Sequence, residues 1–282
     1  MNGRARQELR GKVIAITGGA RGIGLATATR LHRLGAAVAI GDVDTPRVKA
    51  AGEELGLAMH GELDVTDSRS FEEFLDQVER ELGPIDVLVN NAGIMPVGPV
   101  AQEPDTVSKR ILDINVYGVI LGSKLALRRM LPRGSGHIIN LASLAGETFL
   151  PGLATYCGSK AAVIGFTEAA RREHRGTGVR FSAVLPTFTN TELAAGTKGA
   201  RGMRNATPEA VAEAVLNLIV KPRPQIRVTP TSGAMSLSQR FMTIPVADFL
   251  LRAFGMHDAF TTKVNLERRR AYESRARGDE ES

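Results

Sequence analysis

The sequence predicts an α/β fold, a doubly wound parallel sheet with helices on both faces. Seven short apolar runs alternate with longer segments of helical periodicity, and a glycine-rich turn follows the first run directly. The chain of 282 residues contains no Pro/Ser-rich linker that would divide it into separate domains. We therefore expect a single domain whose parallel strands are joined by right-handed crossovers.

The apolar runs are short and rich in β-branched and aliphatic residues, as buried parallel strands are. Strands are expected near residues 13–17, 37–42, 58–63, 85–90, 136–142, 179–185 and 225–229. Helices fill the segments between them. Gly35 closes the first helix, and Thr207 followed by Pro208 opens the helix before the last strand.

Charge and composition limit the classes of function. The net charge of +6 would permit a nucleic-acid surface, but the basic residues are dispersed and no aromatic residues are interleaved with them as stacking platforms. The sequence has no apolar run long enough to span a membrane and no secretory signal at its start, so we expect a soluble cytoplasmic protein. The single cysteine, Cys157, is interpreted as a small apolar filler rather than a catalytic thiol.

Four polar residues in the middle of the chain, Asn115, Ser143, Tyr156 and Lys160, have an order and spacing suited to proton transfer. A phenol titrates near about 10, so Tyr156 can act as a base at neutral pH only where positive charge stabilises its anion. In a helix, the interval of four residues places Lys160 one turn from Tyr156 on the same face. Such a pair alone is weak evidence, because it is common on exposed helices.

The other two members of this group occupy positions that suit a ligand site. Ser143 ends a short buried strand, and ligands of open parallel sheets bind at the carboxyl ends of strands, so its hydroxyl is a candidate donor to a substrate oxygen. Asn115 is expected in mid-helix, which its side chain disfavours, and this predicts a kink that could hold a water next to Lys160. An asparagine that only satisfies a helix junction explains Asn115 equally well.

The first strand continues into a glycine-rich turn and a helix without interruption. Gly18, Gly22 and Gly24 allow a tight turn and a close approach of the backbone to a pyrophosphate. The free N–H groups and the dipole of the helix that follows attract this anion. The spacing, GxxxGxG, differs from the common GxGxxG pattern of dinucleotide-binding proteins.

Asp42 at the end of the second strand indicates the choice of coenzyme. Its carboxylate would accept hydrogen bonds from the adenosine ribose hydroxyls and repel a 2′-phosphate. Arg21, within the glycine turn, favours NADP mildly, because a cation there could meet that phosphate. We give Asp42 the greater weight and predict NAD; the alternative is that Asp42 is only a turn residue, given Asp44 and Pro46 just after it.

Together these motifs resemble those of the classical short-chain dehydrogenase/reductase family. The matches are TGxxxGxG at 17–24, Asn-Asn-Ala-Gly at 90–93, and then in order the asparagine, the serine and Tyr-x-x-x-Lys described above. The resemblance covers about residues 12–229 and implies a Rossmann-type sheet with the strand order 3-2-1-4-5-6-7. It also implies a homodimer or homotetramer, which the long apolar helices expected at 106–132 and 154–175 suggest independently.

The resemblance further implies which residues bind the coenzyme; no metal ligand is expected. They are Gly18, Arg21, Gly22, Ile23, Gly24, Asp42, Asp64, Val65, Asn91, Ala92, Gly93, Tyr156, Lys160, Pro186 and Thr189. In this set, Asp64 would bond the adenine amino group with Val65 packed beside it, although an aspartate at that position is also an ordinary helix cap. Asn91, Ala92 and Gly93 would line the adenosine ribose.

The loop after the sixth strand departs from the family pattern. The family usually has glycine after Pro186, where this chain has Thr187, whose β-branch restricts the path of the loop. Thr189 keeps the position of a threonine that lies near the nicotinamide carboxamide in the family.

These expectations define a reaction, the interconversion of a secondary alcohol with a ketone or aldehyde. Tyr156 takes the hydroxyl proton, the hydride passes to C4 of the nicotinamide of NAD, and Ser143 holds the oxygen. Lys160 lowers the tyrosine pKa and, with Asn115, passes the proton outward. The alternative is a catalytically silent NAD(H)-binding sensor, which would not need all four groups. An epimerase or dehydratase would need a larger carboxy-terminal substrate domain.

The segments expected to cover the substrate pocket are mostly apolar. They are residues 95–100, 144–153 and 188–202, and they hold no cluster of arginines for a phosphate or carboxylate. A hydrophobic or lightly polar alcohol or ketone therefore fits better than a charged metabolite.

The two ends of the chain differ from its body. Residues 1–11 are expected to be a flexible tail, and residues 12–232 the single domain. Residues 233–282 form an extension that is first amphipathic, with an interruption at Pro245, and then charged, which predicts a solvated helix fraying into a disordered end. This extension could cap the substrate pocket, pack on a neighbouring subunit or lie on a membrane surface, in that order of preference.

Overall fold

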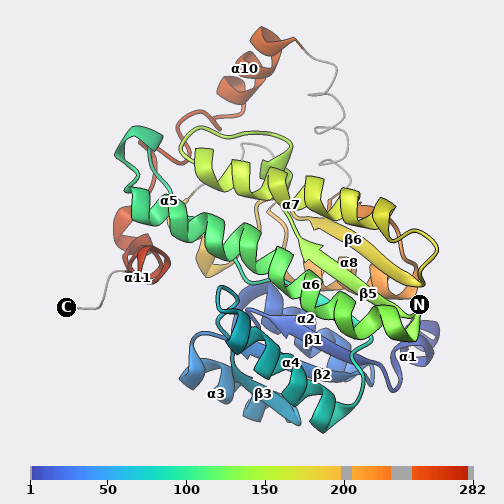
Figure 1. Ribbon diagram of the computed structural model, residues 1–282. Coiled ribbons are helices and arrows are strands. Elements are labelled where there is room, and N and C mark those ends of the chain that lie inside the picture. Colours follow the sequence, from blue (N-terminus) through green and yellow to red (C-terminus); the bar gives the residue numbers. More distant parts are fainter. Residues whose placement is uncertain (1, 198–204, 230–242, 279–282) are drawn as a thin grey trace.

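A computed structural model describes residues 2–197, 205–229 and 243–278. In this part of the chain a seven-stranded sheet has the order β3-β2-β1-β4-β5-β6-β7, and all neighbouring strands are parallel (Figure 1). The strands are β1 (Val13–Thr17), β2 (Ala37–Asp42), β3 (Met59–Glu62), β4 (Val87–Asn90), β5 (Gly136–Leu141), β6 (Val179–Leu185) and β7 (Gln225–Arg227). The predicted fold class and strand order are confirmed.

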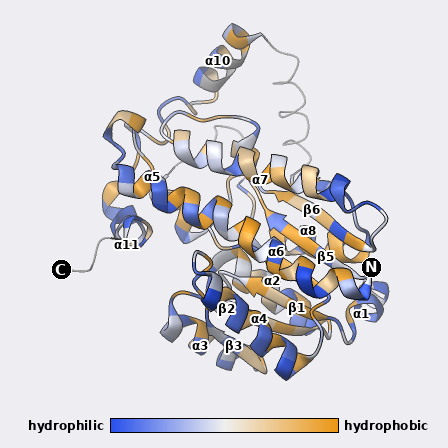
Figure 2. Cartoon of the chain, viewed as in Figure 1, coloured by the Kyte–Doolittle hydropathy of each residue, from blue (hydrophilic) through white to orange (hydrophobic). Residues whose placement is uncertain are grey.

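Helices cover both faces of the sheet (Figure 1). One layer contains α1 (Asn2–Leu9), α2 (Gly22–Arg33), α3 (Thr45–Leu55) and α8 (Pro208–Val220). The other contains α4 (Ser68–Leu82), α5 (Asp105–Leu112), α6 (Gly118–Met130) and α7 (Ala154–Glu173). Each layer buries an apolar stripe against the sheet, such as Leu31 and Leu218 in the first layer and Phe71 and Leu125 in the second. Figure 2 shows the hydrophobic strands enclosed between these helices.

The first residues form a helix rather than the flexible tail that the sequence predicted for residues 1–11. α1 packs against α8, and its residues Ala5 and Leu9, one turn apart, are buried in the core of the first layer. The pattern is weak in the sequence, because only two apolar residues mark the buried face of a helix that is otherwise charged.

The long helix predicted at 106–132 is interrupted in the middle. α5 ends at Leu112, and a π-helical turn, Asp113–Tyr117, connects it to α6. A π-helical turn disturbs the regular bonding of the helix and bends it, and here it carries the side chain of Asn115 into the interior, where Asn115 is fully buried. The break predicted at Asn115 is confirmed.

The C-terminal extension forms two helices, α10 (Ile244–Ala253) and α11 (Leu266–Arg277). α10 projects from the body of the molecule, with Ile244 and Phe249 exposed (Figure 1). α11 instead packs against α5 and against the short helix η5 (Glu192–Ala194), where Arg269 is buried. The frayed helix predicted here is therefore an ordered part of the fold, and the disordered end predicted for the last residues lies outside the described residues.

The helices that the structure describes include none that combines the length and the apolar composition needed to cross a membrane.

Candidate active site

Three of the four predicted catalytic side chains line one cavity at the carboxyl ends of the central strands. Ser143 follows β5, and its Oγ accepts a hydrogen bond from the Ala145 N–H at 3.1 Å, which fixes the hydroxyl at the cavity wall. Tyr156 and Lys160 lie one turn apart on α7 and are 7% and 5% exposed. The tyrosine–lysine pair, which would be inert on an exposed helix, thus lies in a desolvated site.

The phenol of Tyr156 is protonated at neutral pH. Burial raises the pKa of Tyr156 to about 12, although a hydrogen bond with Ser143 opposes the shift and the neighbouring Cys157 adds to it. The sequence predicts that Lys160 lowers this pKa, but in the protein alone burial dominates, and Lys160, whose Nζ lies 5.8 Å from the centroid of the phenol ring, is not among the groups that shift it. A protonated phenol can donate a proton to a bound carbonyl oxygen.

The ammonium group of Lys160 is held at the end of β5. Burial lowers the pKa of Lys160 to about 8, and its Nζ donates a hydrogen bond to the Leu141 carbonyl at 2.9 Å. A Cβ built on Gly93 would lie 3.4 Å from this Nζ and 3.2 Å from Oδ1 of Asn115. The segment after β4 therefore approaches both side chains closely because position 93 is glycine.

Asn115 joins the π-helical turn to two neighbouring segments. Its Nδ2 donates to the Ile94 carbonyl at 2.9 Å and to the Ser159 hydroxyl at 3.1 Å, and its Oδ1 accepts from the Ile94 N–H at 2.8 Å. This is the junction role that the sequence left open. The proton-relay role of Asn115 stays a prediction.

The glycine-rich turn between β1 and α2 has a geometry that fits a pyrophosphate. Gly18 has φ +65°, and a Cβ there would lie 2.8 Å from Cα of Ala92, while a Cβ at Gly24 would lie 2.1 Å from the Gly18 carbonyl oxygen. Among the described residues, none caps the start of α2 at Gly22 with its side chain, so the first N–H groups of that helix can bind an anion. Ile23, in the first turn of α2, lines the cavity.

The Asn-Asn-Ala-Gly segment after β4 is fixed to this turn by two side chains. Nδ2 of Asn91 donates to the carbonyls of Thr17 and Gly18 at 2.9 and 3.0 Å. The Thr17 hydroxyl accepts from the N–H groups of Asn91 and Ala92, both at 3.0 Å. Thr17 thus positions both motifs, although the sequence interpretation assigned it no role of its own.

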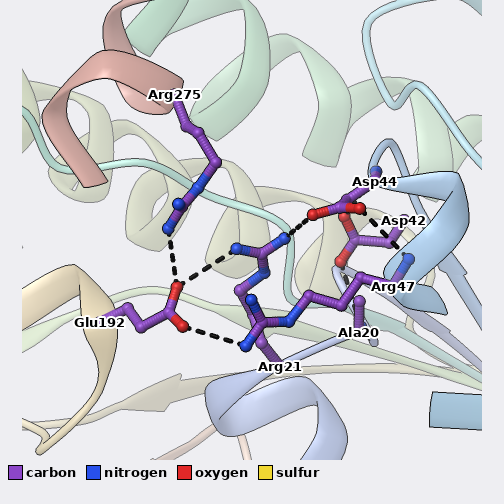
Figure 3. A network of polar contacts seen from close by, with 7 residues as sticks. All are labelled: Ala20, Arg21, Asp42, Asp44, Arg47, Glu192 and Arg275. Atoms are coloured by element: carbon purple, nitrogen blue, oxygen red, sulfur yellow. Dashed lines mark hydrogen bonds and ion pairs between the residues drawn. The ribbon is translucent and has the colours of Figure 1, made fainter. Parts of the chain in front are cut away.

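Asp42 lies at the end of β2 beside the glycine turn. One of its carboxylate oxygens accepts from the Ala20 N–H at 3.1 Å and the other from the Asp44 N–H at 3.2 Å (Figure 3). Asp42 therefore does serve as the turn residue that the sequence offered as an alternative. Each oxygen has a second lone pair, so these bonds are compatible with a further bond to a ribose hydroxyl.

Arg21 is held by carboxylates on both sides. It forms ion pairs with Asp44 and with Glu192 of η5, the latter at 3.2 Å (Figure 3). Glu192 also pairs with Arg47 of α3 at 3.1 Å and with Arg275 of α11 at 2.8 Å. Burial raises the pKa of Glu192, but the three arginines together hold it below its usual value. The charge of Arg21 is thus compensated within the protein.

The predicted adenine-side residues lie after β3. Oδ1 of Asp64 accepts hydrogen bonds from the N–H and the hydroxyl of Thr66, at 2.8 and 2.7 Å, while Asp67 provides the side-chain cap of α4. Val65 is buried against Gly118, where a Cβ would lie 2.9 Å from its side chain. Asp64 therefore stabilises a local turn, and its bond to adenine stays a prediction.

The loop after β6 contributes Pro186, Thr187 and Thr189 to the cavity wall. The Pro186 carbonyl accepts from the Leu144 N–H at 2.9 Å, and the Thr189 hydroxyl donates to the Thr187 carbonyl at 2.9 Å. The Thr187 hydroxyl is buried and has no hydrogen-bond partner among the described residues. Buried hydroxyls are normally paired, so this one is a candidate contact for a polar group of a ligand.

The rest of the cavity is apolar. Its wall includes Met95, Leu150, Leu153, Phe188, Leu193, Met256 and Phe260. Met256 and Phe260 belong to the C-terminal extension, which agrees with its expected role over the substrate pocket. Cys157 packs in the same cluster, and burial raises the pKa of its thiol, as expected of an apolar filler. Glu147, in the loop over the pocket, pairs with Arg227 at 2.7 Å.

Sequence reasoning missed the side chains of α11 that bond the backbone at Met95 and Val97, chiefly Arg269, Tyr272 and Glu273. With Ala276, these positions have the spacing i, i+3, i+4 and i+7 of a buried helix face, and this spacing was the available signal. In the residues that the structure describes, no three His, Cys, Asp or Glu side chains are grouped so that they could hold a metal ion.

Comparison with known proteins identifies relatives with the same motifs. A family model for short chain dehydrogenases matches residues 12–201. The probable oxidoreductase EphD of Mycobacterium tuberculosis is 33% identical over 257 residues, which cover 83% of this chain but only 43% of EphD. The 2-(S)-hydroxypropyl-CoM dehydrogenase 3 of Xanthobacter autotrophicus is 37% identical over 230 residues, which cover 75% of this chain and 90% of that protein.

A solved structure has the same fold. It is the 3-ketoacyl-(acyl-carrier-protein) reductase from Brucella melitensis complexed with NADH, which superposes with a TM-score of 0.72 at 26% sequence identity and covers 78% of this chain and 97% of that one. Sheet order, motifs and relatives agree, and the chain belongs to the short-chain dehydrogenase family.

Proposed function

We propose that this chain is an NAD-dependent oxidoreductase that interconverts a secondary alcohol with a ketone or aldehyde. The observation that supports this best is the environment of Tyr156. Its phenol is buried, the Ser143 side chain interacts with it and opposes the rise of its pKa, Lys160 lies one turn away, and all three line a cavity that Ile23 at the start of α2 also reaches. A coenzyme at α2 and a substrate at Ser143 would therefore meet beside the phenol.

Each side chain has a defined task in this proposal. The nicotinamide, when bound, supplies the hydride acceptor for oxidation or the hydride donor for reduction. Ser143 holds the substrate oxygen, and Tyr156 accepts the proton from an alcohol or donates it to a carbonyl. Lys160, with a pKa of about 8, is mostly charged at neutral pH and stabilises the phenolate. Asn115 lies next to Lys160 near Gly93, where a water could carry the proton outward.

The pKa of Tyr156 determines how each direction depends on pH. A phenol with a pKa of about 12 is already in the form needed for reduction. Oxidation needs the phenolate, so the pKa must fall when the positive charge of oxidised nicotinamide adds to that of Lys160. We therefore expect oxidation to accelerate with rising pH until Lys160, with a pKa of about 8, loses its charge, and reduction to be favoured at neutral pH.

The residues at the end of β2 support NAD rather than NADP. Asp42 would face the ribose hydroxyls and repel a 2′-phosphate. Arg21, the cation that could have bound that phosphate, is already paired with Asp44 and Glu192. The charge of Arg21 is therefore offset, and the preference rests on the carboxylate of Asp42.

The cavity wall supports a hydrophobic or lightly polar substrate, because the side chains around Ser143 and Tyr156 are mostly apolar. Two of the similar proteins are named for compounds with a hydroxyalkyl or a ketoacyl group, which agrees with the proposed chemistry.

We also propose a homodimer or homotetramer in which α7 packs against another copy. The exposed positions along this helix form a stripe of small residues, namely Ala154, Gly158, Ala162, Gly165 and Ala169. Small residues allow the backbones of two helices to approach closely. Light scattering of the purified protein measures the assembly, and a larger residue at Gly165, which has open space around it, should shift it toward monomers.

The experiment that tests the reaction is a panel of secondary alcohols and ketones, assayed by NADH absorbance and repeated with NADP. Tyr156→Phe should keep NADH binding and lose turnover by about a thousandfold. Tyr117→Phe, a change of the same type at an exposed site, is the control and should keep full activity. Normal turnover by a folded Tyr156→Phe would reject the mechanism. Coenzyme binding without turnover of any compound by the unaltered protein would instead favour the NAD(H)-binding sensor.

A further inference from the structure

Side chains of α11 bond the backbone of Met95 and Val97, in the segment that follows β4. The Met95 N–H donates to the hydroxyl of Tyr272 at 2.7 Å, and the Met95 carbonyl accepts from the guanidinium of Arg269. The backbone of Met95, which carries a side chain of the cavity wall, is thus held on both sides by one helix that follows it by more than 170 residues.

The same helix bonds the backbone of Val97, two residues further along the segment, in the same way. The Val97 N–H donates to Oε1 of Glu273 at 3.3 Å, and the Val97 carbonyl accepts from Arg277 at 3.3 Å. Glu273 also pairs with Arg269 and Arg277, so its charge is compensated on both sides. Side chains from two successive turns of α11 therefore form hydrogen bonds with the backbone of this segment.

Arg269 also bonds a second segment of the cavity wall. Its Nη1 donates to the carbonyls of Leu193 at 2.7 Å and Ala195 at 3.0 Å, in the loop after β6. Met95 and Leu193 lie 98 positions apart in the sequence, and both line the cavity around Tyr156. A single guanidinium therefore fixes the spacing of two walls of the pocket.

The burial of this arginine is specific. Arg268, Arg269 and Arg270 are consecutive, yet Arg269 is 0% exposed while its two neighbours face solvent. A buried guanidinium is costly unless its donors are satisfied, and here three carbonyls, one carboxylate and the ring of Tyr272 surround it, with Cζ 4.7 Å from the ring centroid. A buried guanidinium with these partners holds the surrounding segments in place rather than adding charge to the surface.

We propose that Arg269 and Tyr272 are positioning residues that determine the substrate specificity of this enzyme. They hold Met95 and Leu193 so that the cavity accepts a bulky apolar substituent on the alcohol or ketone. The inference rests on the proposed function. It adds that the C-terminal extension recognises the bulky apolar substituent of the substrate. Neither residue lines the cavity itself; both act through the backbone that carries the wall.

The kinetic test compares Arg269→Gln with Arg268→Gln, the same change at the exposed neighbour. For ketones with a bulky apolar group, Arg269→Gln should raise KM about tenfold while kcat changes less than about twofold, because three buried carbonyls lose their donor and the walls separate. The smallest ketones and NADH binding should change less than about twofold. Arg269→Lys keeps the charge but cannot bond all three carbonyls, so we expect it to restore only part of the affinity.

Tyr272→Phe provides a second test that needs no substrate. It removes the acceptor of the Met95 N–H and keeps the ring beneath Arg269, so hydrogen exchange at Met95 should accelerate about tenfold while Val97 stays protected. This measurement remains decisive where Arg269→Gln does not fold or where the unaltered protein turns over none of the panel, which would be a failure of the proposed function alone. Unchanged exchange at Met95, equal losses for small and bulky ketones, or the same effect from Arg268→Gln would overturn the proposal.

Discussion

The coenzyme side and the substrate side of the cavity are built by different means. On the coenzyme side, backbone turns at the ends of neighbouring strands approach one another closely, and the residues responsible lie in the two short motifs at 17–24 and 90–93. On the substrate side, a side chain of α11 forms hydrogen bonds with two segments that are distant in the sequence and so fixes their spacing. The difference suggests that the first side determines which reaction is possible, and that the second determines which substrate reaches it.

The largest effect is expected from Lys160→Met, which removes the side-chain charge next to Tyr156 that the proposed mechanism uses. We expect kcat for oxidation to fall about a thousandfold, because the phenolate loses its stabilising cation. Lys124→Met, at an exposed position of α6, should leave kcat unchanged. Stopped-flow measurement of the hydride step checks this, and a loss of less than about tenfold would show that the reaction does not depend on this ammonium.

The same variant should change the stability in the opposite direction. Burial lowers the pKa of Lys160 to about 8, against about 10.5 in the unfolded chain. Between these values the unfolded state binds more protons, so the free energy of unfolding rises with pH in that window, and at neutral pH the buried charge destabilises the fold. Lys160→Met should therefore be more stable than the unaltered protein at pH 7, by up to roughly 3 kcal/mol, and the gain should shrink toward pH 10. Denaturant titrations at several pH values measure it.

The next effect concerns the glycine turn. A Cβ at Gly24 would lie 2.1 Å from the Gly18 carbonyl oxygen, so Gly24→Ala must move the backbone of the turn that we propose to approach the coenzyme. Overpacking of this kind costs about 1–3 kcal/mol, and we expect NADH affinity to fall by about 50-fold. Gly3→Ala, in α1 with open space around it, is the control. Calorimetry gives both dissociation constants, and an unchanged value for Gly24→Ala would mean that the coenzyme does not contact this turn.

The two sides also differ in how well they could be predicted. The strands, their order and the residues around Tyr156 follow from local patterns, because each apolar run or glycine turn is short and contiguous. The contribution of Arg269 does not follow, since three consecutive arginines look alike until the partner segment near Met95 is known. α1 was missed for a related reason, because the burial of Leu9 depends on α8. The unpaired hydroxyl of Thr187 likewise appears only once the loop is folded.

A smaller effect should follow from Asp42→Ala, which tests how the coenzyme side distinguishes NAD from NADP. Removal of the carboxylate that we propose to face the ribose should weaken NAD binding and relieve the repulsion of a 2′-phosphate, so the preference for NAD over NADP should fall about tenfold, equivalent to about 1.4 kcal/mol. Combining it with Arg21→Ser should reduce the NADP gain, since it also removes the cation of the glycine turn. Ratios of kcat/KM for the two coenzymes test both steps, and an unaltered protein that prefers NADP would contradict the whole argument.

The smallest effect is expected where the two sides meet, at Glu192. This carboxylate pairs with Arg21 of the glycine turn and with Arg275 of α11, and it is itself 43% exposed (Figure 3). Exposed ion pairs contribute about 0.2–1 kcal/mol, so Glu192→Gln should accelerate NADH release only about two- to threefold and reduce its dependence on salt. Because the arginines hold the pKa of Glu192 below its usual value, these pairs persist at neutral pH and are lost only under acidic conditions. Glu53→Gln, exposed on α3, serves as the control. If Glu192→Gln changes the rate of NADH release but salt does not, the network acts by holding its segments in place rather than by its charges. The coenzyme side and the substrate side would then be more rigidly connected than their separate construction suggests.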